Sequence, residues 1–357
     1  MLKKSAYKLL YSFSILWGVA SLVFFLLSVL PGDPSRMMMG QRDQENLRLI
    51  IHQKYGFDQP LAKQYLFYLN DLSPVSFHSK DINHFTNKDN HSYSTWIEVQ
   101  LKCIDILIKS PYLRYSFVQK EKLVSSIIID TIPNTFLLAI SAMSLAIILG
   151  ISLGIIAAVH QNKFIDHFLS TISVFGMALP SFFAAVIVAW LFGYVLHEYT
   201  GLSMTGSLYE VDDYGRGQTR VWSNLILPTI TLGIRPLAVI MQLTRNSLLD
   251  ILNEDYIRTA KAKGLSHTRV LFVHALPNAL NPIITAASGW LASMLAGAVF
   301  IEYIFGWNGI GKEIVSALNF LDLPLVMGSV LTISACFIVI TLLTDIIYYI
   351  IDPRIRN

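Results

Sequence analysis

The sequence is poor in charged residues and in cysteine. Charged side chains make up 14% of the 357 residues, whereas 54% are hydrophobic, and an ordinary soluble domain has about 25% charged residues. This balance excludes a typical water-soluble globule. With only Cys103 and Cys336, the chain builds neither a disulfide framework nor a thiolate metal cluster. The net charge of +3 is too small and too dispersed for nucleic-acid binding, so the expected partner is a lipid bilayer.

In place of charge, the sequence has long apolar runs. A bilayer core about 30 Å thick needs roughly 20 apolar residues in one helix, because every backbone polar group must be satisfied within the segment. Five runs contain no Asp, Glu, Lys, Arg or His, and a sixth contains only Arg235. We therefore expect an all-α integral membrane protein with six transmembrane helices. The predicted spans are residues 9–30, 131–159, 168–196, 221–244, 275–301 and 323–344.

Basic residues indicate the orientation of these spans. With the N-terminus in the cytoplasm, the cytoplasmic segments hold eleven Lys and Arg residues and the short outer loops hold three, which predicts cytoplasmic termini. Residues 31–130 then form a large external region. Apolar residues at helical spacing from Leu47 to Leu69 predict a helical first part, whereas the polar, aperiodic stretch 73–95 predicts a surface loop or a disordered insert. The predicted segments are a first helix at 1–30, the external region 31–130 with a polar insert near 73–113, a five-helix core at 131–351 and a cytoplasmic tail at 352–357.

The predicted cytoplasmic segment 245–280 contains a short helix. Tyr256, Ala260 and Gly264 recur every four positions with Ile257 beside them, so one narrow face is suited to a groove. Gly264 is expected to end this helix. A second helix is expected from Ser266 or His267 to Leu276, stopped by Pro277 and Pro282. These features leave two interpretations open, an interfacial connector and a docking element for a soluble partner.

The same segment resembles the signature loop of ABC importer permeases, in particular the dipeptide/oligopeptide (peptide/nickel) branch. The similarity lies in Asp-Tyr-Ile-Arg-Thr-Ala-Lys-Ala-Lys-Gly-Leu at 255–265 and His-Ala-Leu-Pro-Asn-Ala at 274–279. Arg258, Thr259 and Ala260 occupy the Glu-Ala-Ala positions of the family pattern, and His274 replaces its Ile. Further matching motifs lie, in the family's order, at 31–34, 55–60, 133–135 and 352–356. The external region departs from the family at 70–73, which an insert of roughly forty residues follows.

The resemblance implies the ABC type I importer permease fold and a non-catalytic subunit in the cytoplasmic (inner) membrane of a bacterium. It implies peptides as cargo, with nickel or another small solute as the alternative. The implied partners are a second related permease, an external solute-binding protein and two cytoplasmic ABC ATPases that bind ATP and Mg, so no cofactor is expected in this chain. An ion-coupled secondary transporter is less favoured, because five spans lack ionisable residues over their central portions. The implied ATPase-coupling residues are Glu254, Asp255, Tyr256, Ile257, Arg258, Thr259, Ala260, Lys263, Gly264, Leu276 and Pro277.

Two further features need separate interpretations. Arg235 near the middle of the fourth span costs about 2.5–3.5 kcal/mol in lipid. With Pro236 it is a candidate for the translocation path, while pairing with an acid and snorkelling stay open. Residues 306–312, Gly-Trp-Asn-Gly-Ile-Gly-Lys, match seven positions of a phosphate-binding loop, but Glu313 stands where a hydroxyl is required. We expect a glycine-bent outer turn there. No metal site is expected at the widely spaced His78, His84 and His91.

Overall fold

The computed structural model describes residues 2–29, 45, 49, 52–53, 55–81, 84–88, 91–102, 104–119, 122–211 and 217–351. The chain divides into two compact units: residues 1–131 with 313–335, and residues 132–312 with 336–357. Four sequence features lie outside the described residues, namely the motif at 31–34, the apolar positions Leu47, Ile50 and Ile51, Cys103, and the tail 352–357.

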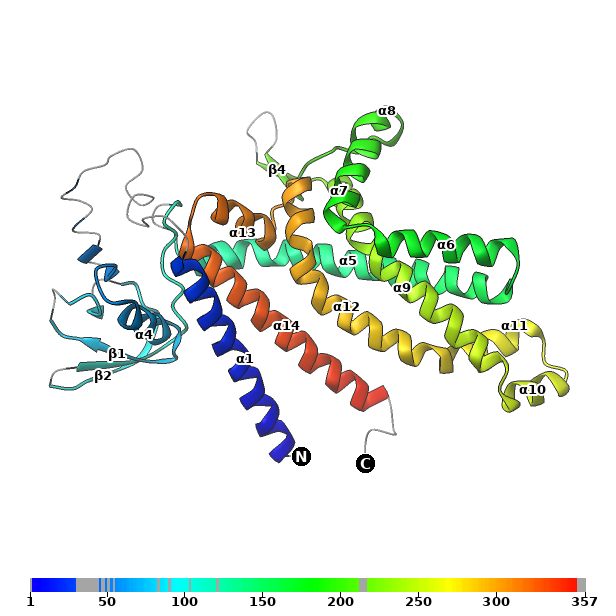
Figure 1. The fold of residues 1–357 in the computed structure, drawn as a ribbon, viewed down its shortest axis with the longest axis horizontal. Coiled ribbons are helices and arrows are strands. Elements are labelled where there is room, and N and C mark those ends of the chain that lie inside the picture. Colours follow the sequence, from blue (N-terminus) through cyan, green and yellow to red (C-terminus); the bar gives the residue numbers. More distant parts are fainter. Residues whose placement is uncertain are drawn as a thin grey trace. The chain divides into compact units, whose positions relative to one another are not determined.

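Five helical segments of the described chain are long and apolar enough to cross a membrane (Figure 1). They cover Leu10–Val29, Val124–Val159, Trp222–Leu252, His267–Phe305 and Leu323–Ile346. Each contains one of the predicted spans or nearly all of it, so the helical membrane architecture is confirmed there. The helices concerned are α1 (Leu2–Val29), α5 (Val124–Val159), α9 (Ile226–Leu252), α12 (Leu276–Phe305) and α14 (Leu323–Ile351).

The predicted third span is not one continuous helix. Helix α6 (Phe164–Ala178) is followed by α7 (Ser181–Trp190), which continues into the π-helical η2 (Leu191–Val195), and the two parts are bent by 108°. Pro180 is the cause, because a proline disfavours helical backbone in the residue before it. Leu179 accordingly has an extended ψ of 129°. The predicted span over 168–196 is therefore a bent pair of helices, which makes a sixth span if the pair crosses the membrane as one. The short α8 (His197–Thr200) follows and ends at the left-handed Gly201.

Helix α9 is central to the second unit. In its most apolar window 61% of the residues are buried, against 22–39% in the other four spans. Close packing of α5 on α9 depends on glycine: a Cβ on Gly150 or Gly154 would lie 2.8 Å from Ile240 or 2.5 Å from Thr244. Before α9 come the antiparallel hairpin of β4 (Tyr209–Val211) and β5 (Gln218–Arg220) and the 3-10 turn η3 (Trp222–Leu225).

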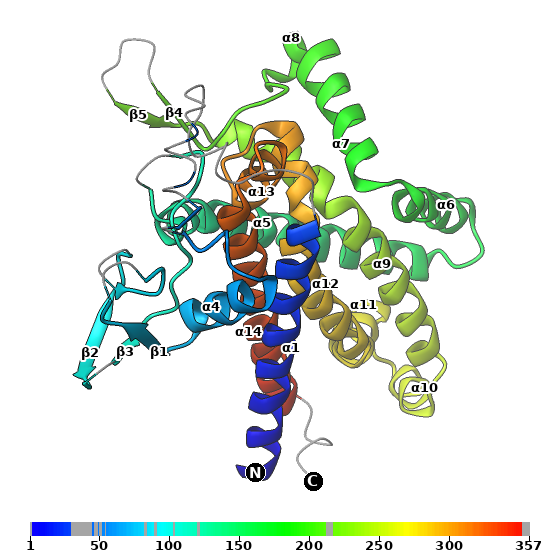
Figure 2. The ribbon, with the colours of Figure 1, turned by 60° about the vertical axis from the view of Figure 1, so that its left-hand side comes forward.

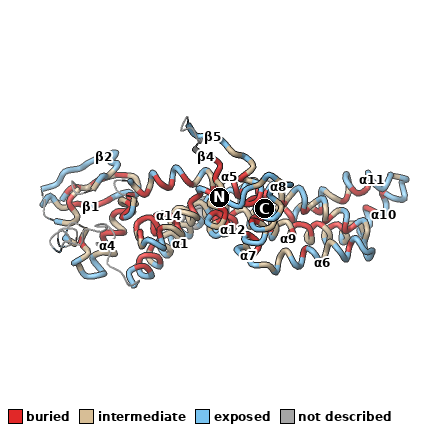
Figure 3. Tube along the Cα trace, turned by 90° about the horizontal axis from the view of Figure 1, so that it is seen from above, coloured by how far each residue is buried: buried red, intermediate tan, exposed pale blue. Residues whose placement is uncertain are grey.

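The first unit contains a three-stranded antiparallel sheet beside α4 (Leu61–Leu72) (Figure 2). The strands β1 (Val75–Ser79), β3 (Ile104–Lys109) and β2 (Thr95–Gln100) lie in the order β1-β3-β2. Strand β1 therefore corrects the expectation of a loop or disorder at residues 75–79 of the stretch 73–95. In β1 the polar residues Ser76 and His78 are buried and the apolar residues Val75 and Phe77 are exposed. The sequence therefore lacks the usual strand pattern, in which the apolar residues face the core. All of β2 is exposed (Figure 3).

A polar cluster forms the core of this sheet region. The fully buried Asp71 accepts hydrogen bonds from the Tyr93 hydroxyl at 2.9 Å and from Arg114 Nε at 2.8 Å. Lys109 Nζ donates to the backbone oxygen of Asp71, and burial lowers the pKa of Lys109 to about 8. This network gives partners to the Asp71 carboxylate, which burial would otherwise penalise.

The histidines of the insert have structural partners. His78 contacts Ser76 Oγ at 2.7 Å and the Thr86 carbonyl at 3.1 Å, and His91 contacts the Phe85 carbonyl at 3.2 Å. His84 Nδ1 lies 2.7 Å from Thr86 Oγ1. Burial lowers the pKa of both His78 and His91. Both rings are therefore predominantly neutral at pH 7.

The loop before α5 is hydrogen-bonded to the beginning of α14 within the same unit. Asp322, just ahead of α14, accepts hydrogen bonds from Ser116 Oγ and from the backbone N–H of Phe117 and Val118, the latter two at 3.0 and 3.4 Å. Asp322 is only 1% exposed. Because removing such a buried acceptor leaves several donors unpaired, this contact holds the first unit together across about two hundred residues of sequence.

Candidate functional site

The short helix α10 (Asp255–Ala262) follows the end of α9 after a tight turn (Figure 1). Asn253 and Glu254 donate their backbone N–H groups to the carbonyls of Asp250 and Ile251 at 3.2 and 3.0 Å. Asp255 lies in the first turn and Lys261 in the last, which complements the helix dipole. The predicted helix beginning near residue 254 and ending before Gly264 is confirmed.

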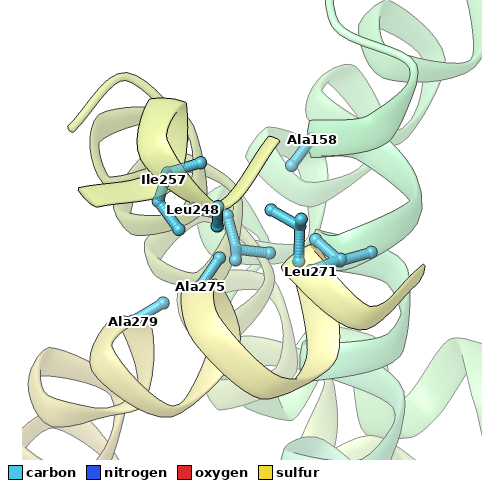
Figure 4. Close-up of a cluster of buried hydrophobic side chains, with 8 residues drawn as sticks. Ala158, Leu248, Ile257, Leu271, Ala275 and Ala279 are labelled. Atoms are coloured by element: carbon cyan, nitrogen blue, oxygen red, sulfur yellow. The ribbon is translucent and has the colours of Figure 1, made fainter. Parts of the chain in front are cut away.

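Two side chains of α10 pack against the rest of its unit (Figure 4). Ile257 is fully buried and Ala260 is 8% exposed. They join a hydrophobic cluster with the end of α5, with α9, and with the π-helical η4 (Val270–Ala275) and the start of α12. Full burial of an isoleucine contributes about 1.5–3 kcal/mol, so α10 is held firmly. The cluster consists of Ala158, Leu248, Ile257, Ala260, Val270, Leu271, Ala275 and Ala279.

The opposite face of α10 is open and charged. Asp255 and Arg258 have side chains 96% and 72% exposed and form an i,i+3 pair at 3.4 Å, which contributes little at such exposure. Glu254, Thr259, Lys261 and Lys263 are exposed too. The predicted groove-binding stripe of Tyr256, Ala260 and Gly264 was therefore partly wrong, because Ala260 packs inside its own chain. Tyr256 is 44% exposed, and its hydroxyl accepts a hydrogen bond from Asn278 Nδ2 at 3.0 Å.

Gly264 reverses the chain after α10. Its φ of +79° is left-handed, a conformation that costs other residues roughly 1–2 kcal/mol. The Leu265 N–H donates to the Ala260 carbonyl at 3.4 Å and thereby closes the helix end. Apart from its two chain neighbours, no atom of the described residues lies within 4 Å of the Cβ that a substitution would add. The requirement for glycine therefore comes from the backbone, and the expected close packing does not occur within this chain.

From His267 the chain is helical without interruption into α12. Ser266 caps α11 (His267–Arg269) by accepting the N–H of Arg269 at 3.4 Å, and η4 and α12 follow directly. The expectation that Pro277 and Pro282 stop a separate helix was wrong. Pro277 lies in the first turn of α12, where a missing N–H costs little, and the wider π-helical turn before it leaves room for the ring. Leu276 packs against the cluster that holds α10.

A buried ion pair next to this region was not predicted from the sequence. Asp166 in α6 is fully buried, and Arg245 in α9 binds it bidentately through Nε and through Nη2, the latter at 2.7 Å. The backbone N–H of Asn162 donates to the same carboxylate at 3.0 Å. The available sequence signal was an acid and a base at the ends of neighbouring spans. The pair fixes α6 to α9 about two helical turns before the loop that leads to α10.

Arg235 and Pro236 lie in the continuous helix α9. Arg235 is exposed in the single chain, and no described residue forms an ion pair with it, whereas Pro236 is buried. Pro236 removes one backbone hydrogen bond without interrupting the helix. A partner acid within the described part of this chain is therefore excluded for Arg235.

The glycine-rich segment 306–312 encloses a carboxylate of the chain itself. Glu302, fully buried near the end of α12, accepts the backbone N–H groups of Gly311 at 2.7 Å and Lys312 at 3.3 Å. A Cβ on Gly309 would lie 2.3 Å from the carboxyl carbon of Glu302. The anion-binding backbone that resembles a phosphate loop is thus already filled. The buried Trp307 donates from Nε1 to the Asn134 carbonyl at 3.1 Å, which ties the turn to α5.

Comparison with known families matches almost the whole chain. Residues 150–357 match the family described as "Binding-protein-dependent transport system inner membrane component", and residues 1–139 match the N-terminal membrane component of such systems. The di/tripeptide transport system permease protein DppB of Pseudomonas aeruginosa is 34% identical over 96% of this chain and 95% of its own length. The dipeptide permease DppB of Bacillus subtilis is 32% identical over 95% and 92%, and that of Haemophilus influenzae is 41% identical over 63% and 71%.

A solved structure supports the same architecture. One chain of the inward-facing MetNI methionine ABC transporter superposes with a TM-score of 0.50 at 15% identity, over 64% of this chain and 97% of that chain. At this level of identity the similarity concerns the fold alone.

Proposed function

Because the chain belongs to the family of binding-protein-dependent transport system inner membrane components, we propose that it is the membrane-spanning subunit of an ATP-driven importer of peptides. It is a multi-pass protein of the bacterial inner membrane. The names of its relatives, which include di/tripeptide and dipeptide permeases, favour peptides over the nickel alternative.

We further propose that the chain forms half of a translocation pore with a second, related permease. Two cytoplasmic ATPases bind ATP and Mg and supply the work, an external solute-binding protein delivers the peptide, and this subunit performs no catalysis. Arg235 fits this assembly. Since it is exposed and has no ion-pair partner in the described part of the chain, burial against lipid alone would cost about 2.5–3.5 kcal/mol. A position on the translocation path or against the second permease avoids that cost.

The mounting of α10 is the observation that carries the proposal. Ile257 and Ala260 join the helix to the end of α5, to α9 and to the segment that becomes α12, while its charged face is open. A protein that gripped this face would therefore move several spans together. Closure of an ATPase pair around α10 would tilt the spans between inward-open and outward-open states. The exposed residues from Glu254 to Lys263 would form the contact, and Gly264, Leu276 and Pro277 would hold its geometry.

Crosslinking tests the contact directly. Cysteines introduced as Arg258→Cys and Lys261→Cys project from the open face, whereas Ala260, being buried, is unsuited. We expect both to crosslink to the nucleotide-binding subunit in the purified complex, and we expect Ile148→Cys, on the exposed side of α5, to give no such product. Absence of the product at both α10 positions would refute α10 as the coupling element.

The mechanical part has its own test. Ile257→Ala removes most of the buried side chain that mounts α10, a change that typically costs 2–5 kcal/mol in a core. We expect ATP hydrolysis by the complex to continue while peptide uptake into proteoliposomes falls. Ile148→Ala deletes the same atoms at a site that is 64% exposed and serves as the control. Unchanged uptake per ATP in Ile257→Ala would contradict the lever model.

A further inference from the structure

The first unit has an open pocket that the transport cycle described above does not use. Its volume is about 810 Å³, and every residue that lines it comes from the first unit, between Gln53 and Thr86. Pockets that bind small ligands usually measure about 300–1,000 Å³. This pocket therefore has the size for a short peptide or a molecule of similar dimensions.

The apolar part of the pocket is a preformed aromatic wall. Phe67 and Phe85 meet edge to face with their ring centres 5.3 Å apart. Phe85 packs against Gly56, whose left-handed φ of +69° and missing Cβ make room for the ring. Phe77 also lines the pocket and is 56% exposed. An exposed aromatic surface beside a hollow is suited to an apolar side chain.

Hydrogen bonds hold the polar part in place. Gln64 Nε2 donates to the carbonyls of Phe57 at 3.2 Å and Gln59 at 2.8 Å, which fixes the turn ahead of α4. The Asn70 side chain pairs with both backbone groups of Phe77, at 2.9 and 3.0 Å. This pairing closes the edge of β1, so an occupant is recognised by side chains and not by addition of a strand.

Both signs of charge line the same pocket. Asp58 and Lys63 are exposed, and no acid in the described part of the chain pairs with Lys63. In the described part of the chain, the Asp58 side chain forms one hydrogen bond, which it accepts from the neutral Gln59 Nε2 at 3.2 Å. A simple anion would not need the aromatic wall, and a fatty acid would not need Asp58. A molecule with an ammonium, a carboxylate and an apolar side chain matches all three features.

We propose that this pocket is a peptide-binding site on the membrane subunit itself, which takes a short zwitterionic peptide with an apolar residue. Lys63 binds the terminal carboxylate, Asp58 binds the terminal ammonium, and Phe77 and Phe85 contact the side chain. The inference rests on the proposed function, because that function brings peptides to this side of the membrane.

Binding to the intact complex tests the site. The complex is placed in nanodiscs without the solute-binding protein and without ATP, and fluorine NMR follows Ala-(4-fluoro-Phe)-Ala with free termini. We expect Lys63→Gln and Phe77→Ser each to raise the Kd about tenfold or more, a difference of about 1.4 kcal/mol. Lys102→Gln, an exposed lysine outside the pocket, should leave the Kd unchanged. The same peptide with acetylated and amidated termini should bind about tenfold more weakly.

Several outcomes would overturn the proposal. They are no binding to the wild-type complex, an equal Kd in Lys63→Gln and wild type, or tighter binding of octanoate than of the peptide at this pocket. Failure of the proposed function is seen separately, as a lack of ATP-dependent peptide uptake by the wild-type complex supplied with its binding protein.

Discussion

Replacement of Gly309 by alanine tests how the turn after α12 is built. Gly309 does not have a positive φ, so alanine meets no backbone strain, and the three atoms nearest to the added Cβ all belong to the Glu302 carboxyl group, at 2.3–2.4 Å. To avoid it, the carboxylate must leave the N–H groups of Gly311 and Lys312. Hydrogen bonds to charged groups contribute about 1.5–3 kcal/mol, and overpacking costs about 1–3 kcal/mol. We therefore expect Gly309→Ala to destabilise the complex by about 3–5 kcal/mol.

A double-mutant cycle isolates this contact. Glu302→Ala alone leaves the buried N–H groups unpaired and should cost about 3 kcal/mol. In the double variant Glu302→Ala/Gly309→Ala the new methyl group enters vacated space, so the total should not exceed that of Glu302→Ala. The two changes should thus couple by about 3–5 kcal/mol.

The assay is unfolding of the purified complex by SDS in mixed micelles. Gly18→Ala in α1 is the matched control, because no described atom beyond its chain neighbours and its own helix backbone lies within 4 Å of the added Cβ. It should change the free energy of unfolding by at most about 0.5–1 kcal/mol. Additive costs of Glu302→Ala and Gly309→Ala would refute the assignment of Glu302 as the group that fills the turn.

Three further results are expected. Arg245→Leu leaves the buried Asp166 unpaired and should destabilise the complex by about 3–5 kcal/mol, part of which Asp166→Asn should restore; equal stability of Arg245→Leu and wild type in the SDS assay would contradict this. Because burial lowers the pKa of His78 and His91 below 6.5, their contribution to stability is complete above pH 6.5 and is lost as the pH falls through the lowered values. Hydrogen-exchange protection of residues 55–119 should thus be weaker at pH 5 than at pH 7.5, with α9 unchanged, and equal protection would count against it. Gly264→Asp should assemble but lose ATPase-coupled uptake, and wild-type transport rates would argue against α10 as the contact.

The apolar spans were predictable because a membrane helix is specified by its own composition. An uncharged run of about twenty residues has few other stable arrangements, and five such helices occur where the sequence indicates them. The bend at Pro180 was not predicted, because the length of an apolar run carries no information about a proline inside it. The continuous helix through Pro277 was missed for the opposite reason, since the π-helical turn that accommodates the proline has no sequence signal of its own.

The candidate site shows the same division between local and tertiary information. The helix at 255–262 and the glycine after it follow from local propensity and were predicted. The direction of its buried face was not, because that direction depends on Ala158, Leu248 and Leu271, which approach from other elements. A four-residue repeat marks a narrow stripe but does not say whether the stripe packs on the same chain or on a partner.

The polar contacts that determine the geometry were the least predictable part. Glu302 accepts a hydrogen bond from the backbone N–H of Gly311, 9 residues away in sequence. Asp166 pairs with Arg245, 79 residues away. The residues 306–312 illustrate the consequence, because their spacing of glycines is that of an anion-binding loop and the loop does bind an oxygen acceptor. That acceptor is the Glu302 carboxyl group of the same chain, which only the folded structure brings to the loop. A glycine pattern therefore specifies a set of free N–H groups, and the tertiary fold decides which group occupies them.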